Sequence, residues 1–198
     1  MRIDWLQQNT PEWLAYRRTK ITASEIAIIM GSNPYSTVED LIGIKCGLKE
    51  VPDNEDMKEG REREQEVRNI VCRDLETIFD PAVHLCEYNP EFMASLDGIS
   101  PDGQELIEIK VVGQNTWGKI LGQGIPLYYY HQMLWQMMCS GAKVGYFIAF
   151  NKKTNKIHMN PISMNSLEIK KMIIAALGFL KQLNEFKLEM KRMEGEFD

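Results

Sequence analysis

A charged pair in an otherwise apolar segment is the feature of this sequence that most directly indicates chemistry. Glu108 and Lys110 lie two residues apart in the run 106–112, whose aliphatic and β-branched residues are typical of a strand. Because side chains alternate across a strand, both charges project from one face. A weak surface ion pair is the simplest interpretation. However, aliphatic residues occupy both faces, as in a covered sheet, where charges need a reason to be buried.

Two further carboxylates can join this pair. Asp97 precedes the turn-rich stretch 98–103, and pairing of the flanking strands would bring it beside Glu108, although Asp-Gly is also a common turn dipeptide. Glu64 falls on the inward stripe of a helix expected over 56–75. Alternatively, it pairs with Arg68 on a solvated face of that helix.

Three converging carboxylates beside a lysine would form an oxygen-rich site suited to Mg²⁺ or Mn²⁺. Such a cation lowers the pKa of bound water and orients it for attack on phosphorus, which is the chemistry of a phosphodiesterase. Lys110 could steady the attacking hydroxide and the phosphorane. The backbone carbonyl of Ile109 could add a neutral ligand if the strand ladder leaves it free.

A second candidate site lies near the N-terminus. Thr22 to Glu25 form a capping box, so the first N–H groups of the following helix, including that of Ser24, favour an anion. Arg17 could complete a phosphate pocket. The alternative is ordinary helix capping beside a surface arginine.

Other polar and aromatic residues have weaker signals. Trp117 and Lys119 could contact a base and a phosphate of DNA, although a loop tryptophan is also a common core anchor. Gln132 and Gln136, one helical turn apart, could bind a water or a phosphate oxygen, or could be ordinary surface residues of a helix.

These residues must be positioned by a chain that alternates helices and strands. Helices are expected over 13–17, 26–30, 36–47, 56–75, 127–140 and 166–193, and strands over 82–88, 92–96, 105–112, 143–150 and 157–162. The Gly- and Gln-rich stretch 113–126 is expected to be a loop. On the last helix, the expected apolar side carries Leu167, Ile174, Leu177, Leu180 and Leu183. The pattern predicts a single α/β (α+β) domain over 1–198.

Composition narrows the class of protein. The 198 residues are 44% apolar and carry a formal charge of −5, which excludes fibrous and disordered chains and argues against a uniformly basic DNA-binding surface. No membrane-spanning stretch or export signal is evident, so we expect a cytoplasmic protein. Four scattered cysteines, without a Cys-x-x-Cys pair, offer no plausible ligands for an iron-sulfur cluster, so none is expected.

Taken in order, several short motifs resemble the YqaJ-like viral recombinases, the lambda-type alkaline exonucleases. They are Arg17-x-x-x-Ile-Thr-Ala-Ser24-Glu, Gly60-x-x-x-Glu64, Ser95-x-Asp97-Gly, Glu108-Ile-Lys110 and Tyr129-x-x-Gln132. The resemblance covers about residues 5 to 150. It implies a PD-(D/E)xK nuclease fold with a restriction-endonuclease-like core: a central mixed sheet of about five strands flanked by helices. Leu96 departs from the motif's usual proline.

The resemblance also implies roles for these residues. Asp97, Glu108, the Ile109 carbonyl and Glu64 would hold Mg²⁺ or Mn²⁺, Lys110 would be the catalytic lysine, and Gln132 would support the attacking water or the substrate. Positions matching Arg17, Ser24 and Ser95 grip the 5′ phosphate. Gln136 is a further DNA-contact candidate. Family members digest one strand of linear duplex DNA from a 5′ end and leave a 3′ overhang for a single-strand annealing protein, and some form ring-shaped homotrimers.

Two other functions remain open at this stage. One is an endonuclease of the same fold that cuts single-stranded or branched DNA internally. The other is a non-catalytic DNA-binding module, which would be expected to have lost the residues of the site. Cas4-like nucleases share the motif but hold an iron-sulfur cluster with four cysteines, and the spacing of Cys46, Cys72, Cys86 and Cys139 does not supply one.

Overall fold

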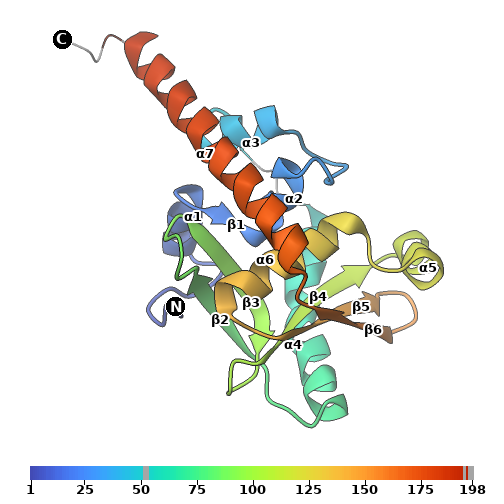
Figure 1. The fold of residues 1–198 in the computed structure, drawn as a ribbon. Helices are drawn as coiled ribbons and strands as arrows, with labels where there is room; N and C mark the ends of the chain where they lie inside the picture. The colour runs from blue at the N-terminus through green and yellow to red at the C-terminus, as the bar shows by residue number, and fades with distance from the viewer. Residues whose placement is uncertain (51–53, 194, 196–198) are drawn as a thin grey trace.

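The computed structural model describes residues 1–50, 54–193 and 195 of the 198-residue chain (Figure 1). The elements in chain order are α1 (Pro11–Arg18), β1 (Ile21–Thr22), α2 (Ala23–Ile29), α3 (Val38–Lys45), α4 (Glu55–Asp74), β2 (Asp80–Leu85), β3 (Phe92–Ile99), β4 (Glu105–Val112), α5 (Gln114–Gln123), α6 (Leu127–Ser140), β5 (Val144–Asn151), β6 (Lys156–Ser163) and α7 (Ser166–Met193). None of the described helices combines the length and apolar character needed to cross a membrane.

The strands form one six-stranded mixed sheet that branches at β3. β2 runs antiparallel along β3 from Met93 to Ile99 and covers one edge of that strand. A strand has only two edges. β1, which pairs with Phe92 and Met93, therefore shares the opposite edge with β4, which pairs with Gly98 and Ile99. Along this edge the sheet forks, because residues 94–97 have no strand partner there among the described residues.

The remaining strands extend the sheet beyond β4. β4 and β5 are parallel over their full length, and β5 and β6 form an antiparallel hairpin. The expected mixed sheet is confirmed, with β1 as a short additional strand.

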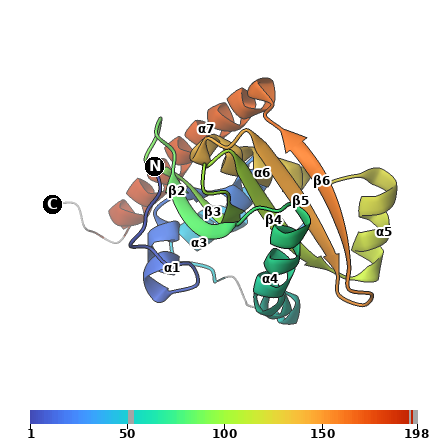
Figure 2. The same ribbon diagram turned by 90° about the horizontal axis from the view of Figure 1, so that it is seen from below.

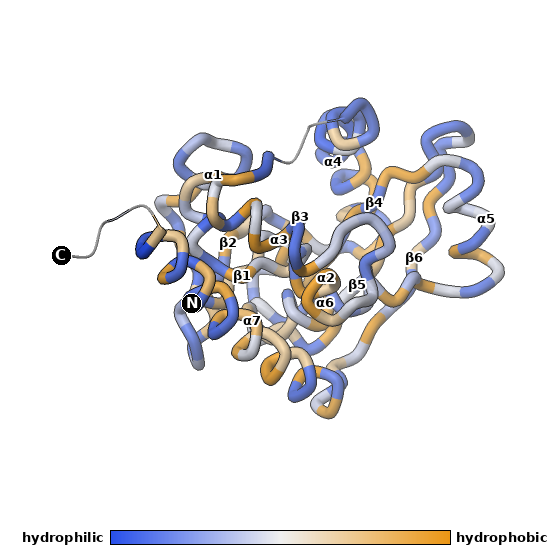
Figure 3. The backbone as a smooth tube through the Cα atoms, turned by 90° about the horizontal axis from the view of Figure 1, so that it is seen from above, coloured by the Kyte–Doolittle hydropathy of each residue, from blue (hydrophilic) through white to orange (hydrophobic). Residues whose placement is uncertain are grey.

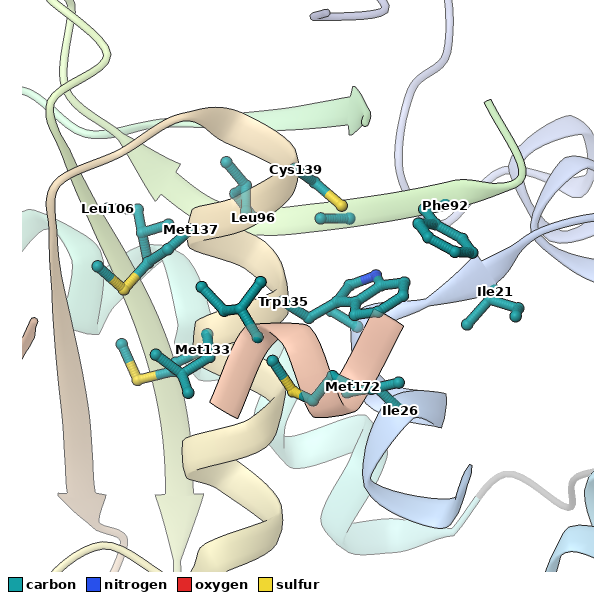
Figure 4. Packing of buried hydrophobic residues seen from close by; sticks show 14 of the residues in the cluster. Ile21, Ile26, Phe92, Leu96, Leu106, Met133, Trp135, Met137, Cys139 and Met172 are labelled. Carbon is teal, nitrogen blue, oxygen red and sulfur yellow. The ribbon is translucent and has the colours of Figure 1, made fainter. Parts of the chain in front are cut away.

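Helices cover both faces of the sheet. On one face, α2, α6 and α7 enclose the largest apolar cluster, in which Trp135 of α6 packs on Phe92 with ring centroids 4.7 Å apart (Figure 4). On the other face, Val67 of α4 packs in a second cluster with Ile107 and Ile109 of β4. Figure 2 shows α4 and α7 on opposite sides of the sheet. The exposed remainder of α4 is mostly hydrophilic (Figure 3), and this layered arrangement matches the expected fold class.

One expected loop is a helix. Glycine and glutamine content predicted a loop over 113–126, but the structure places α5 there. Trp117 and Ile120, three residues apart, are both buried where α5 packs near β5. Burial of this apolar stripe outweighs the low helix propensity of the glycines. A smaller correction concerns α3, which was expected over 36–47 but spans Val38–Lys45. Its N-cap is Thr37, which accepts a hydrogen bond from the backbone N–H of Asp40.

The apolar side of α7 also differs from the expectation. The helix has the expected bounds, but Leu167, Ile174 and Leu177 are exposed, and only Leu183 of the expected set is fully buried. The core-facing residues are Ile169, Met172, Ala176, Phe179 and Leu183. This helix carries two apolar stripes, and its sequence alone did not show which one meets α6.

Candidate active site

Glu108 is a carboxylate held by three other side chains. It lies on β4 and is 2% exposed. Lys110 Nζ is 2.5 Å from Oε1, Gln132 Nε2 donates to the same oxygen at 2.6 Å, and Gln136 Nε2 donates to Oε2 at 2.6 Å. A buried carboxylate requires such partners because an unpaired buried charge is costly. Glu108 and Lys110 are therefore not the weak surface pair of the simplest interpretation.

Asp97 reaches the same region from β3, at the fork of the sheet. It lies within the strand and not in the turn that follows. Its Oδ2 accepts a hydrogen bond from the backbone N–H of Ile109 at 2.7 Å, and its own carbonyl accepts one from Arg68 Nε at 2.7 Å. Side chains thus replace the ladder bonds that β3 and β4 lose where they diverge.

Gly98 permits this arrangement by close packing and not by forming a turn. A Cβ at this position would lie 2.7 Å from Cβ of Phe79 and 2.9 Å from Cγ1 of Ile107. The Asp-Gly dipeptide therefore marks a tightly packed strand.

The carbonyl of Ile109 faces the fork as well. The N–H and C=O of one residue project toward the same edge of an extended strand. Since the Ile109 N–H points to Asp97, its carbonyl is directed into the same gap, beyond the last paired residues of β3 and β4.

Negative charges crowd at this fork. Burial, followed by the carboxylates of Glu108 and Glu64, raises the pKa of Asp97 well above its usual range. Burial lowers the pKa of Lys110, but the attraction of Glu108 and Asp97 outweighs this, so the net pKa is raised and the amine stays protonated. Carboxylates with unfavourable mutual repulsion are a setting in which a further cation binds well.

Glu64 faces this region from α4, and its carboxylate is paired with Arg68 one helical turn along. Arg68 is only 5% exposed, so this pair does not lie on a solvated face. Burial raises the pKa of Glu64, Arg68 lowers it, and Glu108 raises it further. Glu64 is therefore near enough to interact with Glu108, while its direct partner is Arg68.

Oxygen atoms that could bind a metal lie at the fork, but they do not form a complete coordination shell. Within residues 1–50, 54–193 and 195, no three Asp, Glu, His or Cys side chains are grouped as a metal site. The three carboxylates expected to gather therefore do not form a ready-made cluster, because Arg68 holds Glu64. The donor chemistry of Asp97, Glu108 and the Ile109 carbonyl nevertheless fits a hard divalent cation. In the described chain, Oδ1 of Asp97 accepts no hydrogen bond.

Both glutamines of α6, Gln132 and Gln136, donate hydrogen bonds to Glu108. Gln136 is completely buried, and its amide donates to the carbonyl of Ser95 at 3.0 Å as well as to Glu108. The expectation that Gln136 contacts DNA is therefore wrong, because its side chain is sealed beneath the site. The spacing of four residues was the signal for a shared helix face, but it did not identify what that face contacts.

The three residues expected to grip a 5′ phosphate lie in one connected cluster. Arg17 Nη2 donates to Ser24 Oγ at 3.0 Å, and its guanidinium lies 4.5 Å from the centroid of the Trp13 ring. Trp13 Nε1 in turn donates to Ser95 Oγ at 3.0 Å. Ser95 is two residues from Asp97 along β3, so this Arg17 cluster adjoins the fork. Trp13, which links the two halves, was not among the expected residues.

Lys45 stabilises the Arg17 cluster, and it was not among the residues expected from the sequence. Its amine donates to the backbone carbonyls of Arg17, at 3.0 Å, and Lys20, and pairs with Glu25 at 2.8 Å. Glu25 accepts from the N–H of Thr22 at 2.9 Å, which completes the capping box. Lys45 thus fixes the end of α1 against the start of α2. Lysine is rarely buried, so nothing in the sequence singled out Lys45.

The two residues of α5 expected to touch DNA differ. Trp117 is 8% exposed and lies edge-on to His158, with ring centroids 6.3 Å apart, so it is a core anchor. The stacking expectation for Trp117 is therefore wrong. Lys119 is exposed, and its contact with DNA stays a prediction.

Comparison with known proteins identifies the family. No curated protein sequence matches the chain. A model of the YqaJ-like viral recombinase domain matches residues 12–143, which is well over half of the sequence. The chain belongs to the YqaJ-like viral recombinase family. The family suggested by the motifs is thereby confirmed.

Solved structures agree with this assignment. The alkaline exonuclease LHK-Exo from Laribacter hongkongensis is 26% identical, with a TM-score of 0.81 over 96% of this chain and 100% of that one. A structure of LHK-Exo in complex with dAMP gives 25% identity and a TM-score of 0.80, with the same coverage. A phage-related exonuclease from Haemophilus somnus 129PT, 15% identical with a TM-score of 0.66 over 86% of this chain and 96% of that one, shares the fold.

Proposed function

We propose that this protein is a metal-dependent exonuclease of DNA recombination that digests one strand of linear duplex DNA in the 5′→3′ direction and leaves a 3′ overhang. The observation that carries the proposal is the adjacency of two sites on β3, where Asp97 borders Glu108 and Lys110, and Ser95 belongs to the Arg17 cluster. A phosphate pocket beside a hydrolytic centre would hold the end of a strand in register for cleavage. Membership of the YqaJ-like family and likeness to LHK-Exo support it.

We infer that Asp97, Glu108 and the Ile109 carbonyl would hold Mg²⁺, or Mn²⁺, with Glu64 completing the site from α4. When bound, such a cation supplies an acidified water and stabilises charge on the leaving oxygen. Asp97 suits this role because one of its oxygens is already fixed by the Ile109 N–H.

The remaining side chains position and stabilise. The protonated amine of Lys110 lies where it would donate to the attacking hydroxide and to a phosphate oxygen, which stabilises the negative charge that develops during attack. Gln132 fixes the Oε1 oxygen of Glu108 and would orient the attacking water or the substrate. Gln136 holds the opposite oxygen from within the core.

Strand polarity would come from the Arg17 cluster. Arg17, Ser24 and Ser95 present a guanidinium and two hydroxyls, which suit the charge-assisted binding of a terminal phosphate. With a 5′ phosphate there, the next phosphodiester along the strand would lie toward Asp97 and Lys110.

Family membership also supports a proposal about assembly and partners. We propose a ring-shaped homotrimer around DNA that acts in the cytoplasm of the host cell and passes its 3′ overhang to a single-strand annealing protein. A net charge of −5 is compatible with a ring, because only the channel needs to be positive. Light scattering of the purified protein would report a trimer mass, and a monomer mass would remove the ring.

The direct test is a time course with linear duplex DNA labelled at either the 5′ or the 3′ end, with Mg²⁺ or with EDTA. We expect immediate release of 5′-labelled mononucleotide and persistence of the 3′ label in Mg²⁺, and no product in EDTA. Internal fragments without end preference would indicate an endonuclease, and intact DNA that is bound but uncut would indicate a binding module.

A further inference from the structure

An exposed tyrosine lies at the outer end of a row of aromatic rings that leads to Lys110. Tyr35, in the segment between α2 and α3, is 80% exposed. The backbone at Tyr35 is held in an ordered turn, because its N–H donates to Asn33 Oδ1 at 2.8 Å. An aromatic side chain held in water by an ordered turn forgoes the burial that would stabilise it.

The rings that follow Tyr35 belong to the start of α6. Tyr35 meets Tyr128 edge to face, with centroids 6.1 Å apart and planes at 82°, and Tyr128 lies 4.2 Å from Tyr129. The ring of Tyr129 then lies 5.1 Å from Lys110 Nζ. The row is therefore continuous from solvent to the amine of the candidate centre.

We propose that Tyr35 and Tyr128 form a stacking surface for a nucleobase of the DNA end that enters the site. The inference rests on the proposed function and adds to it a substrate contact outside the motifs. Stacking on aromatic side chains suits nucleic acid because every base presents a π face, and the contact is independent of sequence. The edge-to-face contact and the high exposure leave the ring of Tyr35 available to a base.

Tyr128 meets the electrostatic requirement of such a contact. Burial, and then the neighbouring Tyr129, raises the pKa of Tyr128, so its hydroxyl stays protonated and uncharged at neutral pH. A neutral ring does not repel the phosphates that flank a base.

The test compares Tyr35→Ala with a matched variant elsewhere. Tyr88, in the turn between β2 and β3, is 89% exposed and lies outside the row of rings, so Tyr88→Ala removes an equally exposed ring. On blunt linear duplex, we expect Tyr35→Ala to raise KM about tenfold while kcat at saturating DNA stays within about twofold of wild type. Tyr35→Phe and Tyr35→Trp should restore KM, and Tyr88→Ala should leave both constants unchanged.

A binding measurement keeps this inference separate from the proposed function. DNA with 2-aminopurine at the first to third positions from the 5′ end is mixed with protein in EDTA, and fluorescence is recorded. We expect quenching at one of these positions with wild type and its loss with Tyr35→Ala. Equal behaviour of Tyr35→Ala and Tyr88→Ala, or equal impairment by Tyr35→Phe and Tyr35→Ala, would overturn the stacking surface. DNA that wild type binds with quenching but never cleaves would overturn the proposed hydrolysis alone.

Discussion

The Glu108 centre, which comprises Asp97, Glu108 and Lys110, adjoins the Arg17 cluster on β3. The two regions differ in how their charges are balanced. At the centre, the Lys110 amine lies 2.5 Å from a Glu108 oxygen, and two amides complete the shell of that carboxylate. In the Arg17 cluster, the guanidinium contacts hydroxyls and the Trp13 ring and, among the described residues, forms no ion pair.

This difference indicates that the centre is suited to hydrolysis and the Arg17 cluster to binding a phosphate. The centre holds the protonated amine of Lys110 beside two carboxylates, those of Asp97 and Glu108, so these three side chains carry no net positive charge until a metal enters. The Arg17 cluster keeps an unneutralised cation, which is what a phosphate monoester requires. Substitutions in the centre should therefore reduce turnover on every DNA substrate, whereas those in the Arg17 cluster should discriminate between DNA ends.

The largest effect is expected at the amine of the centre. Lys110→Ala should lower the rate of DNA hydrolysis by roughly a thousandfold, because it removes the donor aimed at the developing charge. Release of end label at saturating DNA measures this loss, and Lys170→Ala, on the exposed side of α7, is the matched control on an exposed lysine. Hydrolysis by Lys110→Ala at the rate of Lys170→Ala would contradict the assigned role.

The buried amide behind Glu108 should have the next largest effect. Gln136→Met keeps the volume but removes the donor to Glu108 Oε2, so we expect about a 10- to 100-fold rise in the Mg²⁺ concentration for half-maximal rate. Gln132→Met should shift it less, because Lys110 still holds the oxygen that Gln132 contacts. A lower melting temperature without any change in the Mg²⁺ requirement would reduce Gln136 to a packing residue.

The Arg17 cluster is tested by the chemistry of the DNA end. Arg17→Ala should cost about tenfold in kcat/KM on 5′-phosphorylated duplex, the worth of a charge-assisted hydrogen bond, and much less on 5′-hydroxyl duplex. Arg18→Ala, at the exposed neighbouring position, provides the control. If Arg17→Ala lowers kcat/KM equally on 5′-phosphorylated and 5′-hydroxyl duplex, the cluster does not bind the terminal phosphate.

The smallest effect on DNA hydrolysis is expected at a residue outside both regions, where the change concerns stability. His84 of β2 is buried, and neither ring nitrogen has a hydrogen-bond partner among the described residues. Burial, followed by the positive N-terminus, lowers the pKa of His84 to about 4. The neutral ring is favoured in the fold, so its stabilising contribution is complete above about pH 6.5 and is lost as pH falls toward 4, by up to about 3 kcal/mol.

Urea unfolding at pH 7 and pH 4.5 measures this loss. We expect His84→Leu to remove most of the difference between the two pH values, and His158→Leu to retain it. An unchanged pH dependence in His84→Leu would assign acid sensitivity to other groups.

The sequence predicted the fold well where one physical signal dominated. Period-two alternation placed Glu108 and Lys110 on one face of β4, and the helix expected over 127–140 has the bounds of α6. It failed where tertiary contacts decide between equal local choices. Stretch 114–123 is helical because Trp117 is buried, and the inward face of α7 is selected by what packs against it.

The candidate site, like the fold, could be predicted from the sequence only in part. The resemblance to the YqaJ-like family was sufficient to name Arg17, Ser24 and Ser95 together, and the structure connects them through Trp13. Roles that depend on long-range contacts were not accessible, because nothing local to Lys45 or Gln136 indicates that their polar ends are buried against α1 and Glu108. The pairing of Glu64 with Arg68 was foreseen, but its burial was not.

The proposed hydrolysis requires that Asp97 and Glu108 share a divalent cation at the fork of β3 and β4. Anomalous scattering from crystals soaked in Mn²⁺ would locate this cation. We expect one strong peak at about 2.0–2.3 Å from an oxygen of Asp97 and an oxygen of Glu108, with the Ile109 carbonyl in its shell, and no peak in Asp97→Asn crystals. A wild-type map with no peak at the fork, or with Mn²⁺ bound elsewhere while DNA is still cleaved, would contradict it.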